Sequence, residues 1–264
     1  MKYKIKDNII LLDISPYPIY TSISLLTFIL SFTLYLNKIE GNNNIIIIIG
    51  LISIIFNTYL WWKDIIKESL YKGEHNIQIK KGLNIGFILF IISETLIFGS
   101  FFFSFFYSSL IPDISLSSFW PPKGINIISP YSIPLLNTSI LFFSGLTITA
   151  SQYLITINNK KDSIIYILIT LFLAILFISL QFFEYLSSPF SLNDSVFGSS
   201  FFLLTGFHGA HVIIGIIFII TALIRLSSLH FSSSHYLHFS FSALYYHFVD
   251  VVWIFLFLSL YLWS

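Results

Sequence analysis

Long apolar stretches alternate with short polar segments along the chain. Seven such stretches run over residues 17–36, 45–62, 82–110, 133–157, 163–186, 196–224 and 239–263. Each is long enough to cross a hydrocarbon core of about 30 Å, which takes about 20 helical residues. The stretches are continuously apolar and lack the alternation over about 10 residues that barrel strands show. Because a membrane segment must pair its backbone internally, the pattern predicts an all-α, polytopic membrane protein with seven transmembrane helices.

Turn-forming and charged residues mark the segments between these stretches. Gly41 with three asparagines separates the first two, and four prolines fall in the long gap 111–132. The charged segment 63–81 is expected to divide the chain into an N-terminal two-helix hairpin with its inner-side segment, 1–75, and a five-helix bundle, 76–264. No internal repeat is present, which weakens the case for a transporter built from duplicated halves.

Positive charge is concentrated in alternate gaps. Of the 13 Lys and Arg residues, only Lys38 and Lys123 fall on one side. The other side holds the rest, which are Lys2, Lys4, Lys6, Lys63, Lys67, Lys72, Lys80, Lys81, Lys160, Lys161 and Arg225. By the positive-inside rule, the N-terminus is expected in the cytoplasm or the mitochondrial matrix, and the odd number of spans puts the C-terminus on the opposite side.

Composition narrows the class of protein further. Charged residues make up 9% of the chain and hydrophobic residues 56%, too little charge to cover a soluble domain of this length. The net charge of +1 does not indicate a nucleic-acid partner. The chain has no cysteine, which excludes disulfides, thiolate metal sites and cysteine nucleophiles.

Three carboxylates fall within the predicted spans: Glu94, Glu184 and Asp250. A charge near the bilayer centre costs about 2.5–3.5 kcal/mol on insertion scales, so each is expected to have a partner or a proton. Glu94 lies near the middle of its span and is expected to be mostly neutral. It could handle protons, contact a partner subunit, or simply bond to a neighbouring helix. Glu184 lies at an outer span end, where we expect it to reach interfacial water and serve as a cap.

Histidines share the middle of the last two spans with Asp250. His208 and His211 are three residues apart, as are His247 and Asp250, and this spacing places each pair on one side of its helix. These four residues predict an intramembrane polar network. They could in principle ligate a metal or a haem, but such pairs are more often interhelical hydrogen-bonding groups.

Aromatic and basic residues lie together at the predicted inner surface. Trp61, Trp62 and Lys63 end the second stretch, and Arg225 ends the sixth, before His230, His235 and His238. Indole rings beside cations at the interface are typical of a phospholipid headgroup site, although general anchoring explains them equally well. The histidine-rich gap is expected to be solvated loop.

Several motifs, in order, closely resemble subunit III of the haem–copper cytochrome c oxidases, above all the mitochondrial type. They cover the chain from about residue 57 to its end and include WWKDIIKESLYKGEH (61–75), KGLNIGFILFIISETLIF (81–98), WPPKGI (120–125), LQFFEYLSSPF (180–190), GSSFFLLTGFHGAHVIIG (198–215) and HFVDVVWIFLFLSLYLW (247–263). The first span matches only by length and position.

The resemblance implies a hairpin and a five-helix bundle separated by a V-shaped cleft filled with phospholipid, cardiolipin being one candidate. It implies a core subunit of complex IV with no catalytic centre, haem or copper of its own. Subunits I and II would carry those cofactors and reduce oxygen to water with electrons from cytochrome c. The subunit would pack mainly on subunit I, stabilise its centres and support proton uptake. The location would be the mitochondrial inner membrane, with the N-terminus in the matrix and the C-terminus in the intermembrane space.

Individual residues carry the family's expected roles. Glu94 matches a mid-membrane carboxylate that faces subunit I. The lipid-binding positions would be Trp61, Trp62, Lys63, Lys67, Glu68, His75 and Arg225. Lys63 and Lys67 stand where arginine is usual, and a lysine offers a point charge in place of a bidentate fork. From the pattern of residues alone, a haem-binding membrane anchor and a stand-alone proton channel remain alternatives, and the motif match favours the oxidase subunit.

Overall fold

The computed structural model describes residues 14–38, 43–112, 118–233 and 235–263, so the tail lysines Lys2, Lys4 and Lys6 lie outside the described part. Within these described residues, seven helices are long and apolar enough to cross a membrane, which confirms the all-α prediction. They are α1 (Tyr17–Leu36), α2 (Asn43–Lys67), α3 (Ile77–Leu110), α4 (Ile133–Thr156), α5 (Lys160–Ser187), α6 (Ser195–Ser227) and α7 (Leu237–Leu256). Two π-helical turns, η1 (Glu68–Lys72) and η3 (Phe257–Leu262), continue α2 and α7.

Local sequence signals explain several helix ends. Proline occupies the first turn of α1 and of α4, where a missing N–H breaks no helical bond. At the start of α5, Asn159 caps the helix by accepting a hydrogen bond from the backbone N–H of Asp162. Gly73 ends η1 in the left-handed conformation, with φ of +64°, and its N–H bonds to the carbonyl of Glu68.

The described structure divides into two compact units, residues 1–86 and 87–264, so the division falls within α3. In the first unit, α1 packs along α2. Asn57 donates a hydrogen bond to Ser24 at 2.9 Å between the two helices. A Cβ at Gly50 would lie 3.0 Å from the Cα of Phe28, so the absence of a side chain allows the backbones to approach closely.

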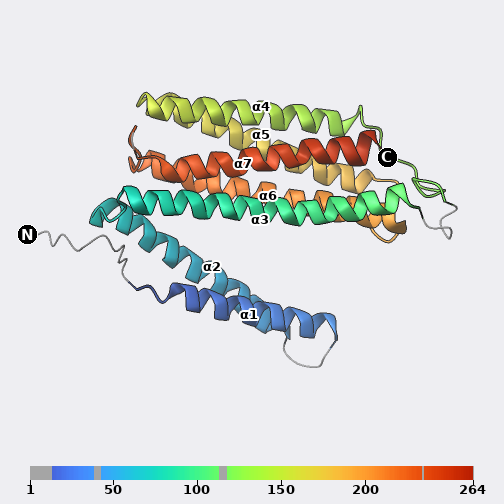
Figure 1. Ribbon diagram of the computed structural model, residues 1–264, viewed down its shortest axis with the longest axis horizontal. Coiled ribbons are helices and arrows are strands. Elements are labelled where there is room, and N and C mark those ends of the chain that lie inside the picture. The colour runs from blue at the N-terminus through green and yellow to red at the C-terminus, as the bar shows by residue number, and fades with distance from the viewer. Residues whose placement is uncertain (1–13, 39–42, 113–117, 234, 264) are drawn as a thin grey trace, which may run out of the picture. The chain divides into compact units, whose positions relative to one another are not determined.

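In the second unit, α4, α5, α6 and α7 run side by side with the later part of α3 (Figure 1). Hydroxyl pairs join α4 to α5: Thr147 with Thr170 at 2.8 Å and Ser151 with Ser163 at 2.8 Å. The buried core is mainly aliphatic and aromatic and is centred on α6 and α7. Such small and hydroxylated contacts are what packing inside a bilayer favours, because hydrocarbon provides no hydrophobic drive between helices.

Aromatic side chains hold α3 against α6 and α7. Phe87 stacks on Phe241 with ring centroids 4.4 Å apart, and Phe101 lies 4.8 Å from Phe207. Phe105 meets the indole of Trp120 edge to face at 5.6 Å. Large rings therefore fill the space between α3 and its neighbours.

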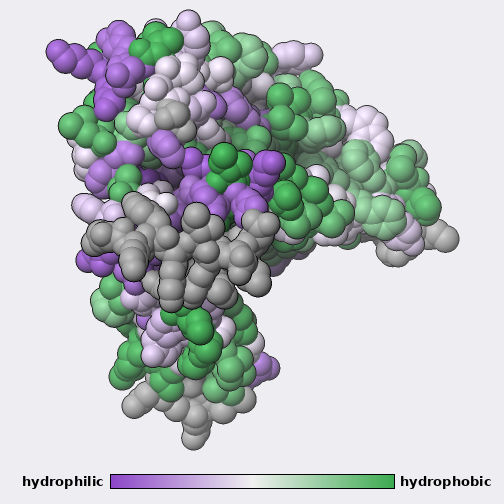
Figure 2. All heavy atoms as spheres, turned by 60° about the vertical axis from the view of Figure 1, so that its left-hand side comes forward, coloured by the Kyte–Doolittle hydropathy of each residue, from purple (hydrophilic) through white to green (hydrophobic). Residues whose placement is uncertain are grey.

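Large apolar side chains cover the outside of the helices. Leu96, Phe103 and Phe172, for example, are 70%, 73% and 65% exposed. Much of the surface visible in Figure 2 is hydrophobic, with hydrophilic patches toward the end that faces the viewer. Patches this large are unfavourable in water, and together with seven spanning helices they fit a multi-pass membrane protein.

Candidate functional site

A carboxyl–imidazole pair joins α3 to α6 inside the second unit. Oε2 of Glu94 lies 2.7 Å from Nε2 of His211, and the two side chains are 17% and 10% exposed. The ring of Phe98 packs edge-on against His211 at 4.9 Å. The sequence suggested a partner on a neighbouring helix for Glu94 without indicating which residue provides it.

The hydrogen bonds of His211 determine how many protons this pair holds. Its Nδ1 lies 2.7 Å from the carbonyl oxygen of Phe207, and a carbonyl can only accept, so Nδ1 carries a proton. Nε2 then either accepts from a protonated Glu94 or donates to an ionised one. In both cases one proton lies in the bond and the pair has no net charge, which suits a site inside the hydrocarbon layer.

His208 is separated from this pair. Its side chain is 1% exposed and lies between the rings of Phe177, 5.8 Å away, and Trp253, 5.1 Å away. Neither ring nitrogen of His208 has a hydrogen-bond partner within the described residues. Three residues along a helix leave an angular offset of about 60°, so His208 and His211 point to adjacent neighbours rather than to the same one.

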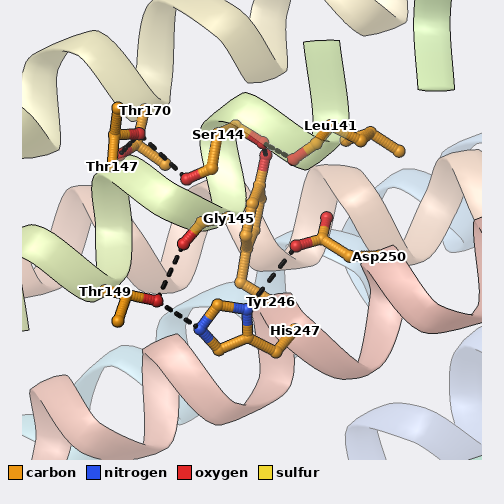
Figure 3. A network of polar contacts seen from close by, with 9 residues as sticks. All are labelled: Leu141, Ser144, Gly145, Thr147, Thr149, Thr170, Tyr246, His247 and Asp250. Carbon is orange, nitrogen blue, oxygen red and sulfur yellow. Dashed lines mark hydrogen bonds and ion pairs between the residues drawn. The ribbon is translucent and has the colours of Figure 1, made fainter. Parts of the chain in front are cut away.

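A second carboxyl–imidazole pair lies between α4 and α7 (Figure 3). Nδ1 of His247 is 3.7 Å from Oδ2 of Asp250, and Nε2 of His247 is 3.1 Å from the hydroxyl of Thr149. Gly145 makes room for the carboxyl, because a Cβ there would lie 2.9 Å from Oδ2 of Asp250. The His247 side chain is 40% exposed and that of Asp250 is 14% exposed.

The contact with Thr149 determines which ring nitrogen of His247 carries a proton. The Thr149 hydroxyl donates a hydrogen bond to the carbonyl of Gly145 at 2.8 Å, so its oxygen accepts one from Nε2–H of His247. Nδ1 of His247 is then the ring nitrogen that faces Asp250, and its distance of 3.7 Å from Oδ2 is beyond hydrogen-bonding range.

The structure thus distributes the predicted polar network over separate places. His211 pairs with Glu94, His247 pairs with Asp250, and His208 lies among aromatic rings. Among the residues that the structure describes, no three His, Asp or Glu side chains converge as a metal site would require. The four-ligand arrangement considered from the sequence is therefore not formed.

Glu184 departs from the expectation that it reaches interfacial water. Its side chain is 1% exposed, and its Oε1 accepts a hydrogen bond from the hydroxyl of Tyr261 at 2.6 Å. Gln181 donates to the same oxygen at 3.4 Å and accepts from Asn137 at 3.3 Å. Sequence reasoning missed Tyr261, since it lies in η3, where the π-helical turn departs from the ordinary helical phase.

A basic cluster lies at the junction of α6 and α7. The guanidinium carbon of Arg225 is 4.8 Å from the ring centroid of Phe231. Nε of Arg225, Nδ1 of His230 and Nδ1 of His238 are buried without a hydrogen-bond partner within the described residues. Nε2 of His238 lies 3.4 Å from the Thr221 hydroxyl. We expected this histidine-rich gap to be a solvated loop. His235 is exposed, but Nδ1 of His230 and Nδ1 of His238 are buried near the end of α6.

The other predicted lipid-binding residues lie in the first unit, at the end of α2, in η1 and just beyond it. Lys67 forms an exposed ion pair with Asp64 at 3.3 Å. The ammonium of Lys63 lies 5.8 Å from the ring centroid of Tyr59. Trp62 is exposed, and Trp61, Glu68 and His75 are half-buried. Aromatic and charged groups are therefore mixed over this segment, as expected for an interfacial region.

Comparison with known proteins identifies the family. Residues 7–264 match the family model described as Cytochrome c oxidase subunit III. The chain belongs to the cytochrome c oxidase subunit III family. A subunit 3 from Prototheca wickerhamii is 44% identical over 254 residues, which cover 96% of this chain and 97% of the relative. One from Marchantia polymorpha is 43% identical over 96% of both chains, and one from Tachyglossus aculeatus aculeatus is 44% identical over 95% of both.

Membership of the subunit III family has consequences for the setting of these sites. The chain is part of cytochrome c oxidase, complex IV, and so functions beside other subunits. The seven apolar helices and the mitochondrial relatives support a multi-pass protein of the mitochondrial inner membrane.

Proposed function

We propose that this chain is a non-redox core subunit of respiratory cytochrome c oxidase that packs on subunit I, binds phospholipid and stabilises the catalytic centres. The haems and copper belong to subunits I and II in this proposal, where electrons from cytochrome c reduce oxygen to water. The observation that carries it is the group of buried, unpaired nitrogen atoms around Arg225.

A phosphate group suits the surroundings of Arg225. An unpaired buried donor costs about 1–3 kcal/mol, so an acceptor from outside the chain is expected at the Arg225 guanidinium. Within the described residues no acidic side chain forms an ion pair with Arg225, which leaves its charge available. The residue lies in the last turn of α6, at a membrane surface where lipid phosphates are concentrated. His230 and His238 offer further nitrogens to the same ligand.

The end of the α1–α2 hairpin supports phospholipid binding independently. Trp61, Trp62 and Lys63 end the apolar part of α2, and Lys67, Glu68 and His75 follow. Indole rings favour the headgroup level, and each nearby basic residue contributes about 1 kcal/mol toward an anionic surface. We therefore assign lipid contact to this segment as well, with cardiolipin as one candidate ligand.

Glu94 is assigned to the interface with subunit I. Its pair with His211 carries one proton and no net charge, and part of its side chain remains exposed. A partly exposed carboxyl in hydrocarbon is best covered by protein, and its proton would make it suitable for supporting proton uptake. The charge distribution along the chain supports an N-terminus in the matrix and a C-terminus in the intermembrane space.

The lipid assignment is tested by replacing Arg225 with leucine in the intact oxidase. The purified variant should contain less bound phospholipid and lose activity sooner during turnover, while its initial rate stays within about twofold of wild type. Arg225→Lys should retain part of the lipid, since lysine keeps the positive charge but cannot bind a phosphate bidentately. Lys161→Leu, which removes an exposed basic residue at the start of α5, is the matched control. Unchanged lipid content in Arg225→Leu would refute the assignment.

A further inference from the structure

The His247–Asp250 pair occupies an unusual position for ionisable side chains. Asp250 lies 13 residues into the span Leu237–Leu262, about 20 Å from either end at 1.5 Å per residue, so it is near mid-depth. His247 is 40% exposed there, and the Thr149 side chain beside it is exposed as well. Ionisable groups at this depth ordinarily face protein or a water-filled cavity.

The site is short of hydrogen-bond donors. Asp250 receives no hydrogen bond from the described residues: its Oδ2 lies 3.7 Å from Nδ1 of His247, and its side chain is 14% exposed, so a donor from outside the chain can reach it. The neighbouring hydroxyl protons are all used elsewhere. Thr149 donates to Gly145, Ser144 donates to Leu141, and Tyr246 consequently donates to Ser144.

Apolar side chains flank this site on both helices in helical register. The exposed residues one turn away on α7 and α4 are Leu244, Val251, Leu146 and Tyr153. Acyl chains could cover these flanks but cannot donate a hydrogen bond, and headgroups lie about 15 Å away. A water molecule at mid-depth would need two or more polar partners to stay bound. A polar side chain on another helix meets both requirements, since it supplies the donor and its helix covers the flanks.

We propose that the α4–α7 face carrying Thr149, His247 and Asp250 is the docking surface for a transmembrane helix of another oxidase subunit, which brings a hydroxyl or amide group to the polar pair. The apolar flanks pack against that helix, and the polar pair sets its depth and rotation. This is the registering role that a single buried polar group serves between helices. The inference does not depend on phospholipid binding at Arg225.

Photo-crosslinking in the intact, purified oxidase tests this surface. A photoreactive amino acid replaces Val251 in one variant and Leu146 in another, which leaves the polar pair unchanged. Both should attach to the same transmembrane segment of another subunit, and that segment should carry a Ser, Thr, Asn or Gln within one turn of the attachment point. Phe172, exposed on α5, is the control position and should not give that adduct.

A second variant tests the polar pair itself. His247→Leu, introduced into the Val251 probe, should reduce the yield of the protein adduct at least fivefold. His247→Gln, which keeps a hydrogen-bonding group, should retain most of it. Adducts with lipid alone at both positions would overturn the proposal, as would a protein segment without a hydrogen-bonding side chain near the attachment point. Solvent exchange into the site with no protein adduct would assign the missing donor to water and also reject the docking helix.

Discussion

Gly145→Ala is expected to destabilise the subunit through one identifiable contact. The added Cβ would lie 2.9 Å from Oδ2 of Asp250 and 3.7 Å from Nδ1 of His247. The first distance is shorter than real Cβ atoms tolerate, so either the carboxyl leaves its place beside His247 or α4 and α7 move apart. Overpacking costs about 1–3 kcal/mol relative to a glycine-to-alanine change in open space, and we expect the lower part of this range because the contacted oxygen ends a side chain. Separation of the pair would add to that cost.

Two controls isolate this effect. Gly99 and Gly206 lie in helices α3 and α6, and a Cβ at either has open space around it. Alanine at these positions should be neutral or slightly stabilising, because alanine has the higher helix propensity by about 1 kcal/mol. The readouts are the yield of assembled oxidase and its half-denaturation temperature in detergent.

A double-mutant cycle links the cost to Asp250. In an Asp250→Ala background, Gly145→Ala should behave like Gly99→Ala, because the contacted oxygen is gone. The interaction energy of the cycle should therefore be of the order of the single-mutant cost, about 1–3 kcal/mol. The contact with Asp250 would be excluded as the cause if Gly145→Ala behaved like Gly99→Ala, or if its effect were the same with and without the Asp250 carboxyl.

Three further outcomes follow from the structure. Tyr261→Phe should destabilise the assembled enzyme by about 1–3 kcal/mol in thermal denaturation, because Glu184 would stay buried without the hydroxyl that donates to it at 2.6 Å. Tyr131→Phe, at an exposed site, should leave the stability unchanged. Glu94→Gln should assemble normally, since an amide can donate to Nε2 of His211, whereas Glu94→Leu should lower the yield of assembled complex. Equal yields from the two variants would argue against the Glu94–His211 hydrogen bond. Trp253→Phe should cost about 0.5–1.5 kcal/mol beyond its lost volume, because the indole donates to Thr138 at 3.0 Å, and a double-mutant cycle with Thr138→Val measures that bond.

The helices could be predicted from the sequence because membrane insertion depends on long apolar runs, which composition alone displays. The partners inside the bundle could not. The spacing of His208 and His211 places them on one side of α6, but about 60° of rotation separates them. That offset directs His211 to Glu94 and His208 to Phe177 and Trp253. Only the packing of the helices decides which neighbour each meets.

Glu184 and the histidines near Arg225 show a different limit. Position near a span end suggested water for Glu184, yet the π-helical turn of η3 brings Tyr261 over it and closes the site. His238 lies in the first turn of α7, which packs along α6, so its ring is near Thr221 instead of in a loop. Both outcomes depend on contacts between segments far apart in the chain, which a single sequence does not reveal.

Phospholipid binding at Arg225 can be checked directly in an experimental density map of the intact oxidase. We expect a phosphate group within hydrogen-bonding distance of the Arg225 guanidinium, with His230 or His238 contacting the same headgroup and acyl chains leading into the membrane. A carboxylate from another subunit in that place, or a guanidinium surrounded by solvent alone, would contradict it.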